Sequence, residues 1–474
     1  MKHPRPRSTP GPQTGPRPGL DPGLHPGACP APESAPQSAP HRAPEPGPSP
    51  TRRLALRAGA LAVAGSAVLL AGCGGGSGPA SGAAGTTGGA SGSAPAGGSS
   101  APALPLPVPS RTPPPSAALP PSTAAAPKPP VACSNAVRLA GWSNTRLAMT
   151  TIAVPVDEGD PSAVTAAVSA GAGGVVLFGS SAPTDLGARL SALKAHVPGG
   201  IGLLVMTDEE GGGIQRMANL VGSLPWPAEM GANWSAAQIK QATTQVGANM
   251  AAAGVNMNLA PVADVDGRSV PPSAENPTGL RSFGADPALV GRDTVAYMQG
   301  MIAGGVIPVL KHFPGIGGST YNSDFGPAQT LPWPTLQQVG IPPFATAIAA
   351  GAPAVMVANN TVPGLATNPG GLSPTVITDE LRGSLGFHGL VVTDALDAKA
   401  ISAAGFDVPQ ATVQSLRSGA DMVMFGLGAD VNAEAATIAA AVVDAVNSGQ
   451  LPRARLIGAV GAVLAVRHVD LCHG

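Results

Sequence analysis

The sequence contains few charged and few aromatic side chains. Only 11% of its 474 residues are charged, 3% are aromatic, and the formal net charge is −1. Nucleic-acid-binding domains gather Lys and Arg into a basic patch or stripe, and this chain has none, so we expect no nucleic-acid partner. The chain has four cysteines, and the two in its foldable part lack the histidine partners of a zinc site. No metal or organic cofactor is therefore expected.

Large apolar side chains are scarce in the first part of the chain. Residues 1–51 and 74–130 consist mainly of Pro, Gly, Ala and Ser. Such segments cannot bury enough apolar surface to offset the entropy lost on ordering, so both are predicted to be disordered. The second tract mixes Gly/Ser-rich and Pro-rich stretches and is expected to act as a partly stiff tether. Residues 131–474 remain, a length that suits one large α/β domain.

A short apolar run preceded by arginines lies between the two tracts, at residues 52–73. The run is too short and too rich in Gly and Ala for a comfortable membrane span, and it is typical of a signal peptide. Its end, Leu70-Ala71-Gly72-Cys73, resembles the lipobox of bacterial lipoproteins. This resemblance implies that Cys73 is lipidated and that the exported protein sits on the outer face of the cell membrane; a plain signal-anchor helix is the alternative. A start codon placed too far upstream would explain the Pro-rich leader.

Two further cysteines lie at the ends of the foldable part. Cys133 lies at its beginning and Cys472 lies two residues from the C-terminus. In an exported protein such a pair suggests a disulfide, the alternative being two unrelated terminal thiols. Chain entropy sets an upper limit of about 5–6 kcal/mol for closing so long a loop.

The pattern from residue 149 onward predicts a parallel barrel. Short β-branched or apolar runs alternate with Ala-rich segments, such as 235–254 and 286–305, that keep helical spacing and end in Gly. We predict eight strands, at 150–155, 173–178, 202–207, 255–262, 306–312, 354–359, 389–394 and 421–426. Eight βα units over about 330 residues predict an α/β fold of the TIM (β/α)8 barrel type.

Polar residues interrupt the apolar runs where the predicted strands end. Active sites of such barrels lie at the carboxyl ends of the strands. One strand-end carboxylate is more often a cap of the next helix, but five strands end in this way, and such a rim suits a small polyhydroxylated substrate. These residues are Asp208-Glu209-Glu210, Asp264, Lys311-His312, Asn359-Asn360 and Asp394.

Five motifs in this region resemble family 3 glycoside hydrolases in order and spacing. They are TDEEGGGIQRM (207–217), NLAPVADV (258–265), NPTGLRSFGADP (276–287), KHFPGIG (311–317) and GFHGLVVTDALDAKAI (386–401). The likeness is greatest to the single-barrel β-N-acetylglucosaminidases (β-N-acetylhexosaminidases) that act on cell-wall fragments, and it covers essentially the whole barrel. It implies hydrolysis, with retention, of terminal N-acetylglucosamine from peptidoglycan fragments.

The resemblance also implies roles for individual residues. Asp394, in the motif of the seventh strand, corresponds to the family nucleophile, which forms a covalent glycosyl-enzyme in retaining chemistry. Asp397 is expected at the surface. Gly213 stands where the family often has Arg, so this contact is expected to be weaker or absent. The implied substrate-binding residues are Asp208, Arg216, Arg281, Lys311 and His312.

The stretch KHFPGIGGSTYNSDF (311–325) departs from the family at its acid/base. The family commonly has a His after KHFPG and, later, Asp-Ser-His, whose His is the acid/base. Here Ile316 replaces the first His and the later triplet is Asn322-Ser323-Asp324. Asp324 occupies the position of the missing His, and a closed, dry site near Asp394 would raise its pKa enough for the same task. Asn322 is expected to orient it.

Other acids are less well placed in the sequence. Glu209 and Glu210 are weaker alternatives, because their segment serves the sugar pocket in the family. No other histidine of the domain is expected to reach the loop; these are His196, His388, His468 and His473.

Two other functions stay open at this stage. One is a catalytically silent envelope lipoprotein that binds muropeptides or amino sugars, and the other is a β-glucosidase of the same fold. Drift to a pure binder should erode the nucleophile as readily as the acid, because a buried carboxylate without a partner is costly, and Asp394 is intact. The KHFPG and EEGG patterns favour an amino-sugar substrate.

Overall fold

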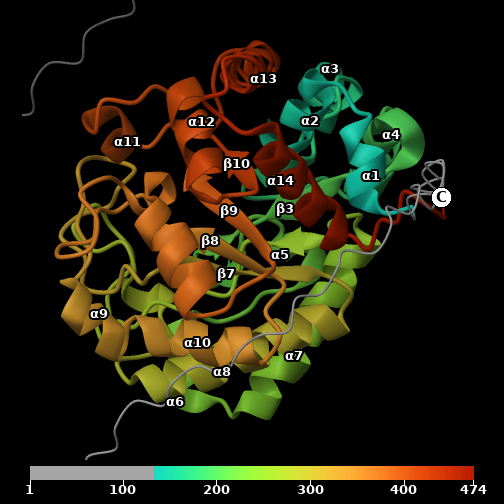
Figure 1. Cartoon of the computed structure of the whole chain (residues 1–474). Helices are drawn as coiled ribbons and strands as arrows, with labels where there is room; N and C mark the ends of the chain where they lie inside the picture. The colour runs from blue at the N-terminus through green and yellow to red at the C-terminus, as the bar shows by residue number, and fades with distance from the viewer. Residues whose placement is uncertain (1–132, 474) are drawn as a thin grey trace, which may run out of the picture. The chain divides into compact units, whose positions relative to one another are not determined.

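The computed structural model describes residues 133–473 (Figure 1). The predicted leader, signal peptide, lipidation site Cys73 and linker lie outside these described residues.

Eight parallel strands close into a barrel, as the sequence predicted. Around the barrel they follow the order β1-β2-β3-β6-β7-β8-β9-β10, and β10 pairs with β1. Their bounds are β1 Ile152–Asp157, β2 Gly174–Phe178, β3 Leu204–Thr207, β6 Met257–Asn258, β7 Ile307–Phe313, β8 Ala354–Val357, β9 Leu390–Ala395 and β10 Met422–Met424. Each predicted strand is present. The fourth is much shorter than predicted, because its regular pairing with β7 ends at Asn258. Beyond it the pairing is irregular: Pro261 has no N–H to donate, and an isolated bridge joins Val262 to Lys311.

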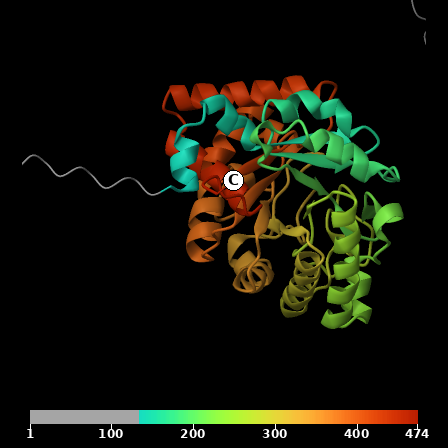
Figure 2. The ribbon, with the colours of Figure 1, turned by 90° about the vertical axis from the view of Figure 1, so that its right-hand side faces the viewer.

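Helices surround the strands, as Figure 1 and Figure 2 show. The α-helices are α1 Asn135–Ala140, α2 Asn144–Thr150, α3 Thr165–Ser169, α4 Leu186–Lys194, α5 Ala218–Val221, α6 Pro227–Asn233, α7 Ala236–Ala252, α8 Pro287–Ala303, α9 Trp333–Val339, α10 Ile341–Ala349, α11 Lys399–Ala403, α12 Val408–Ser418, α13 Val431–Asn447 and α14 Arg453–Ala465. Short 3-10 turns occur at Pro161–Val164, Pro198–Gly200, Gly279–Arg281 and Gly370–Leu372, and Thr375–Ser384 forms a π-helix. None of the described helices is long and apolar enough to cross a membrane.

Local sequence explains where the two longest predicted helices begin. Ser235 and Gln238 form a capping box at the start of α7, satisfying backbone N–H groups that have no helical partner. Asp286 caps α8 through the backbone N–H of Ala288, and Pro287 occupies the first turn, where its missing N–H costs nothing. Both helices were predicted from apolar spacing, and both are confirmed.

The barrel interior is filled by side chains. Alternate strand residues point inward and outward because the side-chain period of a strand is two. Leu204 and Met206 of β3 belong to the interior cluster, whereas Val205 packs into the cluster outside the barrel. The interior cluster also contains Met257, Val309, Met356, Val392 and Met424. Since the interior is occupied, a substrate can bind only at the rim.

The two ends of the domain are joined. A disulfide links Cys133 to Cys472, confirming the sequence prediction. Beside it, the Asn135 side chain donates to the Val469 carbonyl at 2.7 Å and accepts from the Leu471 N–H at 2.7 Å. The first and last helices, α1 and α14, accordingly lie side by side (Figure 1 and Figure 2).

Candidate active site

A pocket of about 640 Å³ opens at the carboxyl ends of the barrel strands. Its walls come from the segments that follow β3, β6, β7 and β9, which are far apart in the sequence. The pocket is lined by all seven residues for which the sequence predicted a catalytic or substrate-binding role, namely Asp208, Arg216, Arg281, Lys311, His312, Asp324 and Asp394. The tertiary structure therefore brings the complete predicted set together.

A network of alternating charges forms the polar end of the pocket. Lys311 Nζ lies 2.6 Å from Asp208 Oδ1 and 2.6 Å from Glu210 Oε1. Arg281 holds Glu210 with a two-pronged contact, Nε to Oε2 and Nη2 to Oε1, both at 2.8 Å. Such bidentate, charge-assisted bonds fix geometry as well as contribute energy. The network leaves ammonium, guanidinium and carboxylate groups at the pocket surface, a set that can bind several hydroxyl groups at once.

The same network sets the charge state of its members. Burial alone would raise the pKa of Glu210, but the charges of Arg281 and Lys311 outweigh it and hold that pKa well below its usual range. Burial would lower the pKa of Lys311, yet Asp208 and Glu210 raise it instead. Glu210 therefore stays ionised and cannot act as a proton donor. This removes one of the weaker alternatives considered from the sequence.

Glu209, the other weaker alternative, faces away from the pocket. Its Oε1 accepts from the Met217 N–H at 2.6 Å and its Oε2 from the Gln215 side chain at 2.9 Å. These bonds brace a small hairpin formed by β4, Glu209–Gly211, and β5, Ile214–Gln215. Burial raises the pKa of Glu209 to about 7, but its carboxyl group does not line the pocket. It holds the hairpin that carries Arg216 and has no access to a bound sugar.

The hairpin accounts for the glycine at position 213, where the family resemblance had led us to compare it with Arg. A Cβ placed on Gly213 would come within 2.8 Å of the Trp226 ring, and one on Gly212 within 2.0 Å. Trp226 thus fills the space that a side chain at these positions would need. Arg216 lies at the end of the hairpin. Its Nη2 is 3.9 Å from Asp208 Oδ2, and its Cζ is 5.9 Å from the centroid of the Phe178 ring.

Asp264 orients His312, a role that its place at a strand end did not reveal. Its Oδ2 lies 2.8 Å from His312 Nδ1, and its Oδ1 accepts from the Ile316 N–H at 2.8 Å. With Nδ1 directed at this buried carboxylate, His312 Nε2 is left to face the pocket, 3.4 Å from Arg281 Nη2. The Asp–His pair therefore fixes the ring so that Nε2 can accept a hydrogen bond.

Asp394 and Asp324 line the same pocket as the charged network. Asp394 is the penultimate residue of β9, and its Oδ1 accepts from the Ala395 N–H at 2.8 Å. The next carbonyl, that of Ala395, accepts from Asn359 Nδ2 at 2.7 Å, which ties the end of β9 to the end of β8. Asp397 is exposed, as predicted, and accepts from the Gly426 N–H.

The Asp324 loop is anchored on two sides. The Asn322 N–H donates to the Ala274 carbonyl at 2.7 Å, and the Ala400 N–H of α11 donates to the Ser323 carbonyl at 3.0 Å. Asn322 Oδ1 accepts from the backbone N–H of Asp324 at 2.9 Å. The prediction that Asn322 orients Asp324 needs this correction: the Asn side chain folds back on the main chain in a turn and does not bind the Asp324 carboxylate.

The Asp324 carboxyl group is suited to holding a proton. Desolvation in the pocket and repulsion by Asp394 together raise its pKa to about 6. The side chain remains exposed at the mouth of the pocket, so a bound sugar that displaces water would raise this pKa further. A carboxyl group whose pKa is raised in this way can serve as the acid beside a second carboxyl group that serves as the nucleophile.

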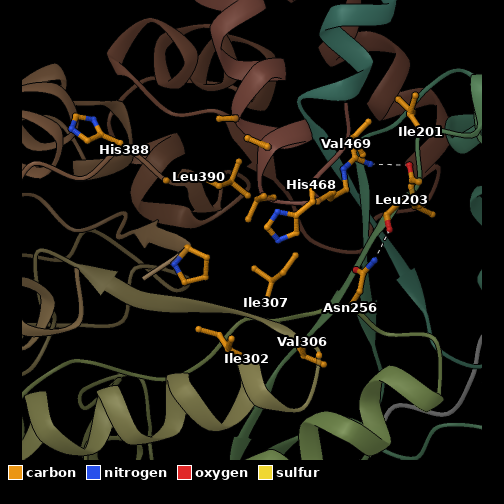
Figure 3. Close-up of a pocket in the computed structure, with 18 residues that line it drawn as sticks. Ile201, Leu203, Asn256, Ile302, Val306, Ile307, His388, Leu390, His468 and Val469 are labelled. Carbon is orange, nitrogen blue, oxygen red and sulfur yellow. Dashed lines mark hydrogen bonds between the residues drawn. The ribbon is translucent and has the colours of Figure 1, made fainter. Parts of the chain in front are cut away.

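No other histidine of the described domain reaches this pocket. His388 and His468 line a separate, mostly apolar pocket (Figure 3). This pocket is also lined by Ile307 and Leu390, the first residues of β7 and β9, and so lies at the amino-terminal end of the barrel. His473 is exposed and lies 2.6 Å from Asp470. His196 lies between α4 and β3. None of these four histidines lines the pocket that contains Asp394.

Phe325 is a pocket residue to which the sequence analysis gave no role. Phe325, directly after Asp324, lines the pocket and has 62% of its surface exposed. The available signal was an aromatic side chain next to the expected acid, in a chain with few aromatics.

The domain is similar to known proteins of one family. The model of the glycosyl hydrolase family 3 N-terminal domain matches residues 161–466. The β-hexosaminidase LpqI of Mycobacterium tuberculosis is 34% identical over 289 residues, which cover 59% of this chain and 71% of LpqI. A β-hexosaminidase of Stenotrophomonas maltophilia is 35% identical over 263 residues, covering 53% of this chain and 75% of the relative.

Solved structures show the same architecture. A β-N-acetylhexosaminidase from Beutenbergia cavernae superposes with a TM-score of 0.64 at 31% identity, covering 70% of this chain and 100% of that one. A family 3 glycosyl hydrolase from Mycobacterium smegmatis gives a TM-score of 0.62 at 32% identity, covering 69% and 98%. The family match spans most of the described domain, and these relatives share its barrel. The chain therefore belongs to glycosyl hydrolase family 3 and is a glycoside hydrolase related to β-hexosaminidases.

Proposed function

We propose that the protein is a retaining β-N-acetylhexosaminidase that removes terminal N-acetylglucosamine from peptidoglycan fragments, with Asp394 as the nucleophile and Asp324 as the acid/base. One observation carries the proposal: Asp394 and Asp324 line the same pocket as the Asp208–Lys311–Glu210–Arg281 network. A sugar bound on this network would present its anomeric carbon to two carboxyl groups, which is what retaining hydrolysis requires.

The polar end of the pocket would hold the terminal sugar. Asp208 offers two acceptor oxygens for neighbouring hydroxyls, and Lys311, Arg281 and Arg216 offer donors. His312 Nε2 adds an acceptor whose direction Asp264 fixes. Because the buried pairs hold their partners before the sugar arrives, little side-chain entropy is lost on binding. These contacts would set the position of the anomeric carbon relative to Asp394.

The reaction then proceeds in two steps. The Asp394 carboxylate attacks the anomeric carbon while Asp324 gives its proton to the departing glycosidic oxygen, so that a covalent glycosyl-enzyme forms and the aglycone leaves. Water then attacks the same carbon, Asp324 takes its proton, and Asp394 is released. Two inversions give net retention. A pKa of about 6 suits Asp324 for giving and taking a proton near neutral pH.

The substrate assignment has its own support. Relatives at 34–35% identity are named β-hexosaminidases, and the signal peptide with Cys73 predicted from the sequence would place the enzyme beside the cell wall as a lipoprotein.

Replacing Cys73 with Ala should release the protein from membranes. Continued membrane association of that variant would contradict lipid anchoring.

The decisive experiment compares two substrates and three proteins. Purified wild type, Asp394→Ala and the control Asp379→Ala, which removes an exposed carboxylate of the π-helix, are assayed on an aryl N-acetyl-β-glucosaminide and the matching β-glucoside. We expect turnover of the amino sugar by wild type and control and none by Asp394→Ala. Preference for the glucoside would support a β-glucosidase, and no Asp394-dependent turnover by folded protein would support a silent sugar-binding lipoprotein.

The acid assignment needs a different comparison. Asp324→Ala should lose far more rate on a methyl glycoside, whose leaving group must be protonated, than on a dinitrophenyl glycoside. Azide should rescue the variant and give the β-glycosyl azide, because azide attacks the glycosyl-enzyme without needing a base. Equal losses on both substrates would remove Asp324 from this role.

A further inference from the structure

Phe325 is the most exposed large apolar side chain among the described residues that line the pocket. Among the described residues that line the pocket, Leu259, Met356, Met424 and Ile316 are 0–6% exposed, whereas Phe325 is 62% exposed. Leaving a phenyl ring in water forgoes the stabilisation that its burial would provide. A broad apolar surface at the edge of a polar pocket is therefore a candidate contact for a ligand.

Phe325 is held in place through its main chain. Its N–H donates to the Asn322 carbonyl at 3.1 Å, and the N–H of Lys399 donates to the Asp324 carbonyl at 3.3 Å. Together with the Ala274 and Ala400 contacts of the same loop, these bonds fix the peptide that joins Asp324 to Phe325. All of them use backbone atoms, so the side chain at position 325 can be changed without removing them.

The chemistry of the pocket locates the leaving group near this ring. The terminal sugar occupies the polar network, and the acid must contact the glycosidic oxygen that joins this sugar to the rest of the substrate. Whatever is attached to that oxygen begins beside Asp324, at the mouth of the pocket. The residue that follows Asp324 and lines the same mouth is Phe325.

We propose that Phe325 is the platform for the leaving-group sugar and makes the enzyme selective for substrates whose aglycone begins with a pyranose ring. The proposal rests on the proposed function. A pyranose whose ring substituents are mainly equatorial, as in glucosamine, has a face of axial C–H groups that can pack flat on a phenyl ring, and Phe has no polar atom that could hydrogen-bond to individual hydroxyls. The platform would therefore favour a sugar of this kind over a small alkyl group through packing alone.

The kinetic consequence separates this role from a merely structural one. Packing of the aglycone on Phe325 is present in the Michaelis complex as well as in the transition state, so its loss should raise KM and leave kcat nearly unchanged. Misplacement of Asp324 would instead lower kcat on every substrate that needs acid assistance. The split between KM and kcat is therefore the informative readout.

The test measures two substrates that both need acid assistance and differ in the aglycone. These are N,N′-diacetylchitobiose, whose leaving group is a sugar, and methyl N-acetyl-β-glucosaminide, whose leaving group is methanol. The proteins are wild type, Phe325→Ala, Phe325→Tyr, which keeps the ring, and Leu427→Ala. Leu427 is 51% exposed, follows β10 at the same end of the barrel and does not line the pocket.

We expect Phe325→Ala to lower kcat/KM on the disaccharide about tenfold, mainly through KM, and to change the methyl glycoside less than about twofold. Phe325→Tyr and Leu427→Ala should stay close to wild type on both. If Phe325→Ala loses kcat/KM equally on the two substrates, or loses none on the disaccharide, the proposed role of Phe325 as a platform is wrong. Turnover of neither substrate by wild type would overturn the proposed function as well, which distinguishes the two failures.

Discussion

The pH dependence of the first chemical step follows from the position of Asp324. The acid must be protonated to assist departure of the aglycone, and desolvation together with the Asp394 charge raises its pKa to about 6. As pH rises through this value the protonated fraction falls, so the rate on a substrate with a poor leaving group must fall too. In Asp324→Asn the side chain does not titrate, and this dependence should disappear.

The size of the effect can be calculated from that pKa. With a pKa of about 6, roughly nine-tenths of Asp324 is protonated at about pH 5 and roughly one-tenth at about pH 7. We therefore expect kcat/KM on methyl N-acetyl-β-glucosaminide to fall about tenfold between these two pH values. The fall of kcat with pH should occur at a higher pH than the fall of kcat/KM. Bound sugar displaces water from the exposed Asp324 carboxyl group, and this disfavours the charged form of that group.

The assay is a pH profile of kcat/KM on the methyl glycoside and on a dinitrophenyl glycoside. The second substrate should show a much shallower fall, since its leaving group departs with little protonation. Asp324→Asn should be slow on the methyl glycoside and flat over the same range. If kcat/KM of the wild type on the methyl glycoside falls only well above pH 7, or if the same fall persists in Asp324→Asn, another group is the acid.

Three further predictions concern stability. Glu210→Gln should lower the free energy of unfolding by about 3 kcal/mol in denaturant titration, because it leaves the two buried cations with one carboxylate fewer; a loss no greater than that of Asp379→Asn would contradict this. Replacing Cys133 and Cys472 with Ser should lower it by at most about 5–6 kcal/mol, and an unchanged value would show that the disulfide contributes nothing to stability. Asp324→Asn should raise the melting temperature at about pH 7 but not at about pH 4, because the raised pKa means that ionising Asp324 destabilises the folded state; a gain independent of pH would refute that reasoning.

The barrel and its rim could be predicted because the relevant signals are local. Each strand is a short apolar run, and the residue that ends the run lies at the carboxyl end of that strand wherever the strand is placed. Lys311 and His312, at the end of β7, and Asp394, at the end of β9, were located in this way. The strand β6 was predicted, but not its short length, because apolar residues continue past Asn258, where its regular pairing with β7 ends.

Other features depend on contacts that the sequence does not reveal. Gly213 could be recognised as unusual, but only the fold shows that Trp226 fills the adjacent space. Asn322 could be linked to Asp324 by its spacing, yet whether it binds the carboxylate or the main chain depends on the turn that the loop adopts. The exposure of Phe325 likewise depends on how the whole rim is assembled.

The sequence by itself determined the barrel, its eight strands and the polar residues that end them, because these follow from periodicity and strand boundaries. Only the tertiary structure decided what each carboxylate can do. Glu210 is held ionised by Arg281, 71 residues away, and by Lys311, whereas Asp324 lies beside Asp394 and binds its proton more tightly. The pKa of a carboxyl group depends on burial and on nearby charges, and those charges come from strands that only folding brings together.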